Sequence, residues 1–82
     1  MPRQQQVQVL PEGLKAWRKV RGLSQAGLAA ATEHQVSEGL IAQIETGRRQ
    51  PGLSNGRAIA AALDVDLEAF AIVFGDEAEA AA

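Results

Sequence analysis

Residues 23–29 read Leu-Ser-Gln-Ala-Gly-Leu-Ala, and residues 36–51 read Val-Ser-Glu-Gly-Leu-Ile-Ala-Gln-Ile-Glu-Thr-Gly-Arg-Arg-Gln-Pro. In each stretch a serine precedes apolar residues at helical spacing, so its hydroxyl can accept a backbone N–H and begin a helix. The two stretches therefore predict short helices over 25–32 and 38–45. Residues 32–35 carry no apolar side chain and indicate a polar turn. Two short helices joined by such a turn predict a helix-turn-helix.

Three further helices are predicted around this pair, which makes the expected fold class an all-α domain of five helices. Pro11 suits the first turn of a helix and Gly22 the position after its end, so a helix is predicted over 11–21. After a Gly- and Pro-containing loop, Ser54 or Asn55 can begin a fourth helix. Asp66 can begin a fifth, since apolar residues then recur at helical spacing. The expected core is Leu14, Trp17, Leu23, Leu28, Val36, Ile41, Ile44, Ile59, Leu63, Leu67 and Phe70.

The 82 residues are expected to hold one domain. The expected division is an N-terminal arm at 1–10, the helical domain at 11–75 and an acidic, alanine-rich disordered tail at 76–82. Residues 6–9 alternate polar and apolar and are typical of a short strand or of a loose glutamine-rich end, and we expect the latter. Residues 72–74 favour either a short strand or the last turn of the fifth helix, and again we expect the latter.

The composition excludes several kinds of chemistry. There is no cysteine and only one histidine, His34, so we expect no disulfide, no metal site and no cofactor. No glycine-rich phosphate loop follows a strand and no nucleophile has a neighbouring base, so we do not expect an enzyme. The chain has neither an apolar run long enough to span a membrane nor a signal peptide, which predicts a soluble, cytoplasmic protein.

The charges are divided unevenly along the chain. The formal net charge is -2. Residues 1–57 hold eight basic and four acidic side chains, a net +4, whereas residues 58–82 hold six acidic and no basic ones, a net -6. The first portion can therefore meet phosphate groups while the second would avoid them, although an ordinary solvated surface explains the same distribution.

The two opening stretches, together with Ile59-Ala60-x-Ala62-Leu63-Asp64-Val65, resemble the XRE family of helix-turn-helix domains, to which Cro and the phage repressors belong. The resemblance spans residues 14–70. It implies a lambda-repressor-like fold that binds double-stranded DNA and places the second helix of the motif in the major groove.

The resemblance also implies roles for particular residues. Base reading falls to the start and exposed face of the helix over 38–45, where a glutamine can pair with adenine through two hydrogen bonds. Phosphate binding falls to an amide and to arginines, whose planar fork suits phosphate oxygens. A solvated surface is the alternative for each exposed residue. The implied base-reading residues are Ser37, Glu38, Gly39, Ala42 and Gln43; the phosphate-binding residues are Gln25, Arg48, Arg49 and Arg57; and Arg18 and Glu45 form a structural salt bridge.

Three positions depart from the family pattern. The thirteen steps from Leu28 to Ile41 are about two more than is usual, which predicts a lengthened turn. Gln35 stands where that turn usually has glycine, and Gly56 stands where the fourth helix usually presents a leucine to the core.

Two functions follow as hypotheses. The first is a sequence-specific transcriptional regulator, a repressor, that acts as a homodimer on a pseudo-palindromic site. Its dimer surface is expected within 66–75, at Phe70, Ile72, Val73 and Phe74. The second is a protein-interaction module of the same fold, an antitoxin that binds a toxin or a phage or plasmid protein that binds another regulator, and the acidic portion favours it.

Overall fold

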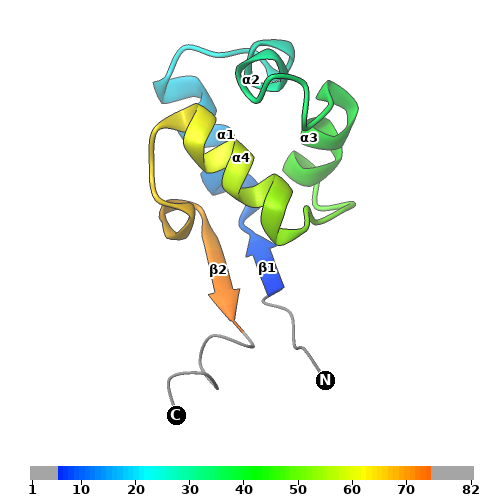
Figure 1. Ribbon diagram of the computed structural model, residues 1–82, viewed down its shortest axis with the longest axis vertical. Coiled ribbons are helices and arrows are strands. Elements are labelled where there is room, and N and C mark those ends of the chain that lie inside the picture. The colour runs from blue at the N-terminus through cyan, green and yellow to red at the C-terminus, as the bar shows by residue number, and fades with distance from the viewer. Residues whose placement is uncertain (1–5, 75–82) are drawn as a thin grey trace.

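Four α-helices and a two-stranded antiparallel sheet make up residues 6–74, the part of the chain that the computed structural model describes (Figure 1). The predicted tail at 76–82 lies outside the described residues. No helix within 6–74 is long and apolar enough to cross a lipid bilayer. In chain order the elements are β1 (Gln6–Val9), α1 (Pro11–Val20), α2 (Gln25–Ala31), α3 (Glu38–Glu45), α4 (Leu53–Leu63), a 3-10 turn at Leu67–Ala69 and β2 (Ala71–Phe74).

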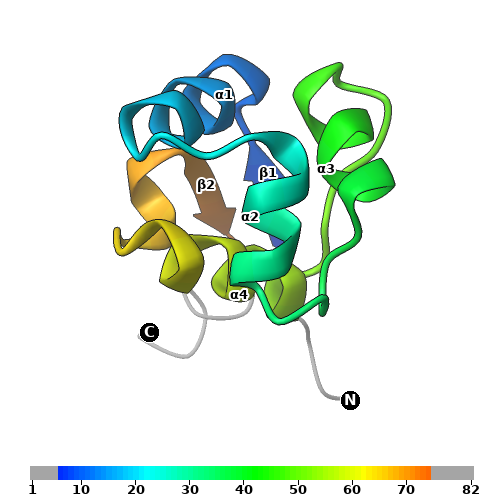
Figure 2. The ribbon, with the colours of Figure 1, turned by 90° about the horizontal axis from the view of Figure 1, so that it is seen from above.

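The helix-turn-helix is formed by α2 and α3, as predicted. Each begins where the sequence places a serine: the Ser24 hydroxyl accepts the N–H of Gly27 at 2.9 Å, and the Ser37 hydroxyl accepts that of Leu40 at 3.1 Å. Seen from above, α2 and α3 lie side by side, with α1 and α4 flanking them (Figure 2). Helices this short are only marginally stable alone, so their packing against the rest of the domain stabilises them.

The prediction that Ser54 or Asn55 begins α4 is wrong. The helix starts at Leu53, after Gly52, and no side chain caps it. Both polar side chains instead receive hydrogen bonds from the turn before α3: the Gln35 amide lies 3.1 Å from Ser54 Oγ and 3.2 Å from Asn55 Oδ1. They therefore tie the helix-turn-helix to α4.

The fifth helix predicted from Asp66 onward is also wrong. A single 3-10 turn at Leu67–Ala69 replaces it, and the chain then continues as β2. Residues three apart lie on the same side of a 3-10 turn, so one turn suffices to bury both Leu67 and Phe70. The β-branched residues that follow pair with β1 instead of continuing the helix.

The expectation of a loose end at residues 6–9 is wrong as well. Gln6–Val9 pairs with β2 in the register Gln6↔Phe74 to Val9↔Ala71. The alternation of the sequence has the consequence expected of a strand, since Val7 and Val9 are buried and the glutamines are exposed. Strand-like ends, the alternative interpretation at both places, are what the structure has.

The core lies between the four helices and the inner face of the sheet. Nine of the eleven predicted core residues are buried, and Trp17 and Leu23 are half-buried against them. The indole N–H of Trp17 donates to the carbonyl of Ala69 at 3.3 Å, so α1 also holds the 3-10 turn. The other buried apolar residues are Val7, Val9, Ala29, Ala60 and Ala71.

Each of the four helices ends with the same pair of backbone hydrogen bonds around one left-handed residue, an arrangement known as the Schellman motif. The left-handed residue is glycine after α1 and α3, Gly22 and Gly47, but it is Glu33 after α2 and Asp64 after α4. A side chain other than glycine costs about 1 kcal/mol or more in this conformation. A carboxylate is also unfavourable near the negative end of a helix.

Replacing Asp64 by glycine is therefore expected to raise the free energy of unfolding, by about 0.5–1 kcal/mol. Urea-induced unfolding followed by circular dichroism measures the change. The matched control is Gly22→Ala, because a Cβ there would meet no atom within 4 Å and only the backbone is strained. That variant should lose about 1 kcal/mol, and changes of the same sign in both variants would contradict the explanation.

Candidate nucleic-acid interface

One face of α3 packs in the core and the opposite face is open to solvent. Ile41 and Ile44 are completely buried, and Glu45 is buried beside them. Ala42 is half-buried and the remaining residues assigned to base reading are exposed: Ser37, Glu38, Gly39 and Gln43. The structure thus brings the five predicted base-reading residues together along the start and outer face of one helix.

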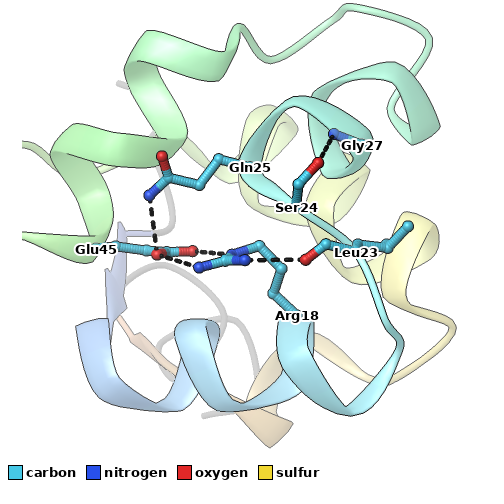
Figure 3. Close-up of polar contacts among 6 residues, drawn as sticks. All are labelled: Arg18, Leu23, Ser24, Gln25, Gly27 and Glu45. Carbon is cyan, nitrogen blue, oxygen red and sulfur yellow. Dashed lines mark hydrogen bonds and ion pairs between the residues drawn. The ribbon is translucent and has the colours of Figure 1, made fainter.

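The salt bridge implied by the resemblance is present and holds the end of α3 against α1 (Figure 3). The Arg18 guanidinium donates from Nε to Glu45 Oε2 at 2.7 Å and from Nη2 to Glu45 Oε1 at 3.0 Å. Its third contact, from Nη1, goes to the carbonyl oxygen of Leu23 at 2.9 Å. The side chains of the pair are 11% and 4% exposed, so both charges are largely removed from water.

This environment shifts both pKa values toward the charged forms. Burial alone would raise the pKa of Glu45, but hydrogen bonds from Arg18 and Gln25 and the nearby charges of Arg18 and Lys15 outweigh it and lower that pKa. The hydrogen bond with Glu45 raises the pKa of Arg18, against the opposing effect of burial. The pair therefore stays ionised in the folded protein.

Gln25, predicted to bind phosphate, lies at the start of α2 and is half-buried. Its amide nitrogen donates to Glu45 Oε1 at 3.1 Å, and Figure 3 shows the side chain reaching from α2 to the end of α3. An amide carries two N–H groups, so this contact leaves one for an anion. Glu45, on α3, thus accepts hydrogen bonds from Arg18 on α1 and from Gln25 on α2, and so joins the three helices.

One carbonyl group of α3 accepts several hydrogen bonds from the loop that follows. The carbonyl oxygen of Gln43 accepts the backbone N–H of Arg48 at 2.8 Å and of Arg49 at 3.3 Å, and the Thr46 hydroxyl at 3.1 Å. Both arginine side chains are exposed. The base-reading candidate and the two phosphate-binding candidates are therefore connected through the backbone.

A shallow hollow lies on this surface, lined by Ala42, Gln43, Thr46 and Arg48. Thr46 has no role in the sequence prediction. It follows Gln43 by three residues and so shares its helix face, and this spacing is the signal that identifies it. Arg57 is not part of this hollow: it lies on α4 and lines another one together with Asp66 and Glu68.

The turn between α2 and α3 is held in place by polar contacts. Glu33 and His34 both have positive φ values, 58° and 63°. The buried Thr32 hydroxyl donates to the carbonyl of Ala29 at 2.7 Å and accepts the N–H of Val36 at 3.1 Å. With the contacts of Gln35 to α4, these bonds fix residues 32–36, so the turn positions α3 instead of leaving it loose.

The acidic residues of the described C-terminal portion follow α4 and lie in or beside the 3-10 turn: Asp64, Asp66 and Glu68, all exposed. Figures 1 and 2, which view the molecule from perpendicular directions, both place this turn on the opposite side of the molecule from α3. The negative charge of this portion is therefore separated from the outer face of α3.

The residues predicted for a dimer surface are divided by the structure. Phe70 is completely buried, so its assignment to that surface is wrong and its other assignment, to the core, is confirmed. Its position at the end of the 3-10 turn directs it inward. Val73 is half-buried, whereas Ile72 is 50% and Phe74 45% exposed.

The chain is similar to known proteins in sequence and in structure. The family model described as HTH_3, helix-turn-helix, matches residues 14–70. No curated protein matches the chain. A crystal structure of an HTH_3 family transcriptional regulator from Vibrio cholerae is 34% identical with a TM-score of 0.67, and the match covers 74% of this chain. It covers 33% of that chain, so this protein spans about a third of that regulator. The restriction-modification controller protein C.AhdI from Aeromonas hydrophila is 29% identical with a TM-score of 0.67, and the match covers 72% of this chain and 83% of that one.

Proposed function

Since this chain belongs to the HTH_3 helix-turn-helix family, we propose that it is a DNA-binding transcriptional regulator that reads a specific sequence with α3. The names of the two similar structures, a transcriptional regulator and a restriction-modification controller protein, support this proposal. The proposal is one of binding and includes no catalytic step.

The observation that carries the proposal is the surface formed by Gln43, Thr46 and Arg48. These residues line one hollow on the outer side of α3, while the inner side of the same helix is fixed by the core and by Glu45. A helix held rigidly on one side, with polar side chains on the other, is suited to the major groove. The acidic turn after α4 lies away from this surface, so it does not oppose the approach of phosphates.

Within this surface we assign separate tasks to the side chains. Gln43 is the main base-reading residue, because its amide can both donate to and accept from adenine. Ser37, Glu38, Gly39 and Ala42 lie beside the bases and shape the contact. Arg48, Arg49 and Gln25 bind backbone phosphates and set the register of the helix. We leave Arg57 out of the surface, because two carboxylates line its hollow.

We also propose that the protein acts as a homodimer and represses transcription. One short helix contacts few bases, and two copies on half-sites about one helical turn apart double the number. The exposed side chains of Ile72 and Phe74 support an association of this kind. Repression is the simplest mode of action for such a dimer, because an occupied operator blocks access to the DNA.

A second candidate function is binding to a protein partner, such as a toxin or another regulator. The acidic portion of the chain, a net -6 over residues 58–82, favours it. In this case the outer face of α3 would have no role in binding, and its substitution would leave the complex intact.

Selection of bound sequences from a random DNA pool tests the proposal. A dimer that neutralises about six phosphates is expected to lose affinity with a log–log salt slope of about -5. Arg48→Ala/Arg49→Ala should weaken binding to all sequences and reduce the slope by roughly one for each phosphate that is no longer neutralised. Gln43→Ala should instead change the preferred sequence.

The matched control is Arg57→Ala, which removes one positive charge from a different hollow and should leave both the salt slope and the sequence preference unaltered. If no DNA is bound at low salt, the DNA-binding proposal is rejected. If both surface variants bind as the unmodified protein does, the assigned residues are wrong.

A further inference from the structure

The outer edge of β2 presents unpaired backbone groups. The N–H of Leu10 donates to the carbonyl of Phe70 at 2.9 Å, at the position that continues the strand register. Because the groups of successive residues alternate in direction, those of Ile72 and Phe74 also point at β1. The N–H and C=O groups of Ala71 and Val73 consequently point away from β1, and no hydrogen bond reaches them from the part of the chain that the structure describes.

The corresponding edge of β1 is partly occupied, at Val9. The Gln50 side chain lies against Val9, whose N–H donates to Gln50 Oε1 at 2.6 Å and whose carbonyl accepts from Gln50 Nε2 at 3.3 Å. An amide side chain that donates to and accepts from one residue replaces the neighbouring strand there. Of the two edges of this sheet, β2 is therefore the one whose outward groups are all free within the described residues, whereas a side chain occupies Val9 on β1.

The composition of β2 favours pairing at that edge. Ala-Ile-Val-Phe contains no charge and no proline, the features with which proteins usually protect an exposed strand. The strand packs mainly on β1 and on the 3-10 turn, and Figure 1 shows no other segment along its outer side. Ile72 and Phe74 project from the outer face of the sheet, each about half exposed.

We propose that a second copy of this chain pairs its β2 with this β2, antiparallel and about a two-fold axis, to form a four-stranded sheet. One register uses all four outward groups: Ala71 bonds Val73 of the second copy and Val73 bonds its Ala71. Ile72 then faces Ile72 of the second copy in a non-hydrogen-bonded pair, where side chains approach most closely. Phe74 lies diagonally across from that isoleucine.

The occupant is a second copy because the strand is complementary to itself. An isologous interface needs a surface whose parts match after a two-fold rotation, and a strand with two outward residues on either side of one central residue has this property. This inference specifies how the proposed homodimer forms. Only the role of the dimer rests on the proposed function, because the pairing itself requires no DNA.

Cysteine cross-linking tests the register. The chain has no cysteine, so Ile72→Cys introduces a single thiol at the predicted axis. Non-hydrogen-bonded pairs hold Cα atoms at about 4.5 Å, which lies within the range for disulfides. Oxidised Ile72→Cys should therefore form a covalent dimer. The matched controls are Phe74→Cys, which would lie roughly 13 Å from its counterpart by strand rise, and Gln8→Cys, on the same face of β1. Both should form far less.

Sedimentation equilibrium without DNA tests the association itself. Ile72→Lys places two like charges opposite each other and should raise the dimer dissociation constant at least about tenfold. Gln8→Lys puts the same charge beside Ile72 on β1 and should change it little. Val73→Pro removes an outward N–H that β1 does not use, and it should also produce monomers. Circular dichroism establishes that each variant is folded.

A monomer at all concentrations, or a dimer that Ile72→Lys leaves unchanged, would overturn the inference. So would equal cross-linking of Phe74→Cys and Ile72→Cys. A dimer with these properties that fails to bind DNA supports the inference and rejects the proposed function. If the protein binds DNA but its β2 does not pair with a second copy, the proposed function is supported and the inference is rejected.

Discussion

Replacing Arg18 by methionine is expected to lower the free energy of unfolding by about 3 kcal/mol. The variant leaves the Glu45 carboxylate buried without its partner and removes the donor to the carbonyl of Leu23. For a domain of this size the midpoint of thermal unfolding should fall by roughly 15 °C. Differential scanning calorimetry measures it.

Two further variants separate the salt bridge from the volume of the side chain. Arg18→Met/Glu45→Leu replaces both charges by apolar groups and should recover most of the loss, because the buried charge is no longer unpaired. Lys19→Met, on the same helix but exposed, should cost less than about 0.5 kcal/mol. If the double variant is as unstable as Arg18→Met, the explanation by an unpaired charge is wrong.

The pKa of Glu45 provides an independent readout of the same pair. Because this pKa is lower in the folded than in the unfolded protein, the stabilisation is present above the unfolded value of about 4.3 and is lost as pH falls through the folded value. The difference in stability between the unmodified protein and Glu45→Gln should therefore shrink below about pH 4. A difference that stays constant from pH 7 to pH 3 would contradict the assigned shift.

Replacing Gly56 by leucine should be similarly damaging, with a loss of about 2–3 kcal/mol. A Cβ on this buried glycine would lie 3.4 Å from Leu67 Cδ1 and 3.6 Å from Val7 Cγ1. Those two side chains occupy the space into which a leucine would extend. The variant must therefore displace β1 or the 3-10 turn, and urea-induced unfolding measures the cost.

The matched variant is Gly56→Ala. Its single methyl group fits at ordinary contact distance, and alanine favours a helix interior over glycine by about 0.8–1 kcal/mol. It should therefore leave stability unchanged or raise it. A large loss in the alanine variant would mean that the space around Gly56 is already full. If the leucine and alanine variants were equally stable, the packing of β1 would not depend on the small volume of residue 56.

The helix-turn-helix could be predicted from the sequence because its signals are local. Ser24 and Ser37 each cap a helix whose apolar residues follow within one or two turns, and Gly22 and Gly47 end helices at the positions where only glycine is free of strain. The Arg18–Glu45 pair came from the family resemblance, not from spacing. Its geometry, with Gln25 as a third member, depends on three helices meeting and required the structure.

The sheet could not be predicted in the same way. Gln6 and Phe74 pair although they come from opposite ends of the chain. Each strand has only four residues, and over β2 the helical spacing of apolar residues is a stronger signal than the strand pattern. The pairing of β1 with β2 and the small volume of Gly56 depend on each other, since the glycine leaves room for Val7. A glycine at position 56, where the family usually has leucine, indicates in the sequence that a large side chain is not accommodated there. Only the structure shows that Val7 and Leu67 fill the space.

The Gln50 side chain has a consequence for the size of the assembly. An open sheet edge can accept a further strand, and a chain with two open edges can grow into a fibre. Here each copy contributes one open edge, that of β2, and one at which an amide occupies the backbone groups of Val9. Two copies joined through β2 consequently carry this amide at both outer edges, where it opposes the pairing of a third strand at Val9.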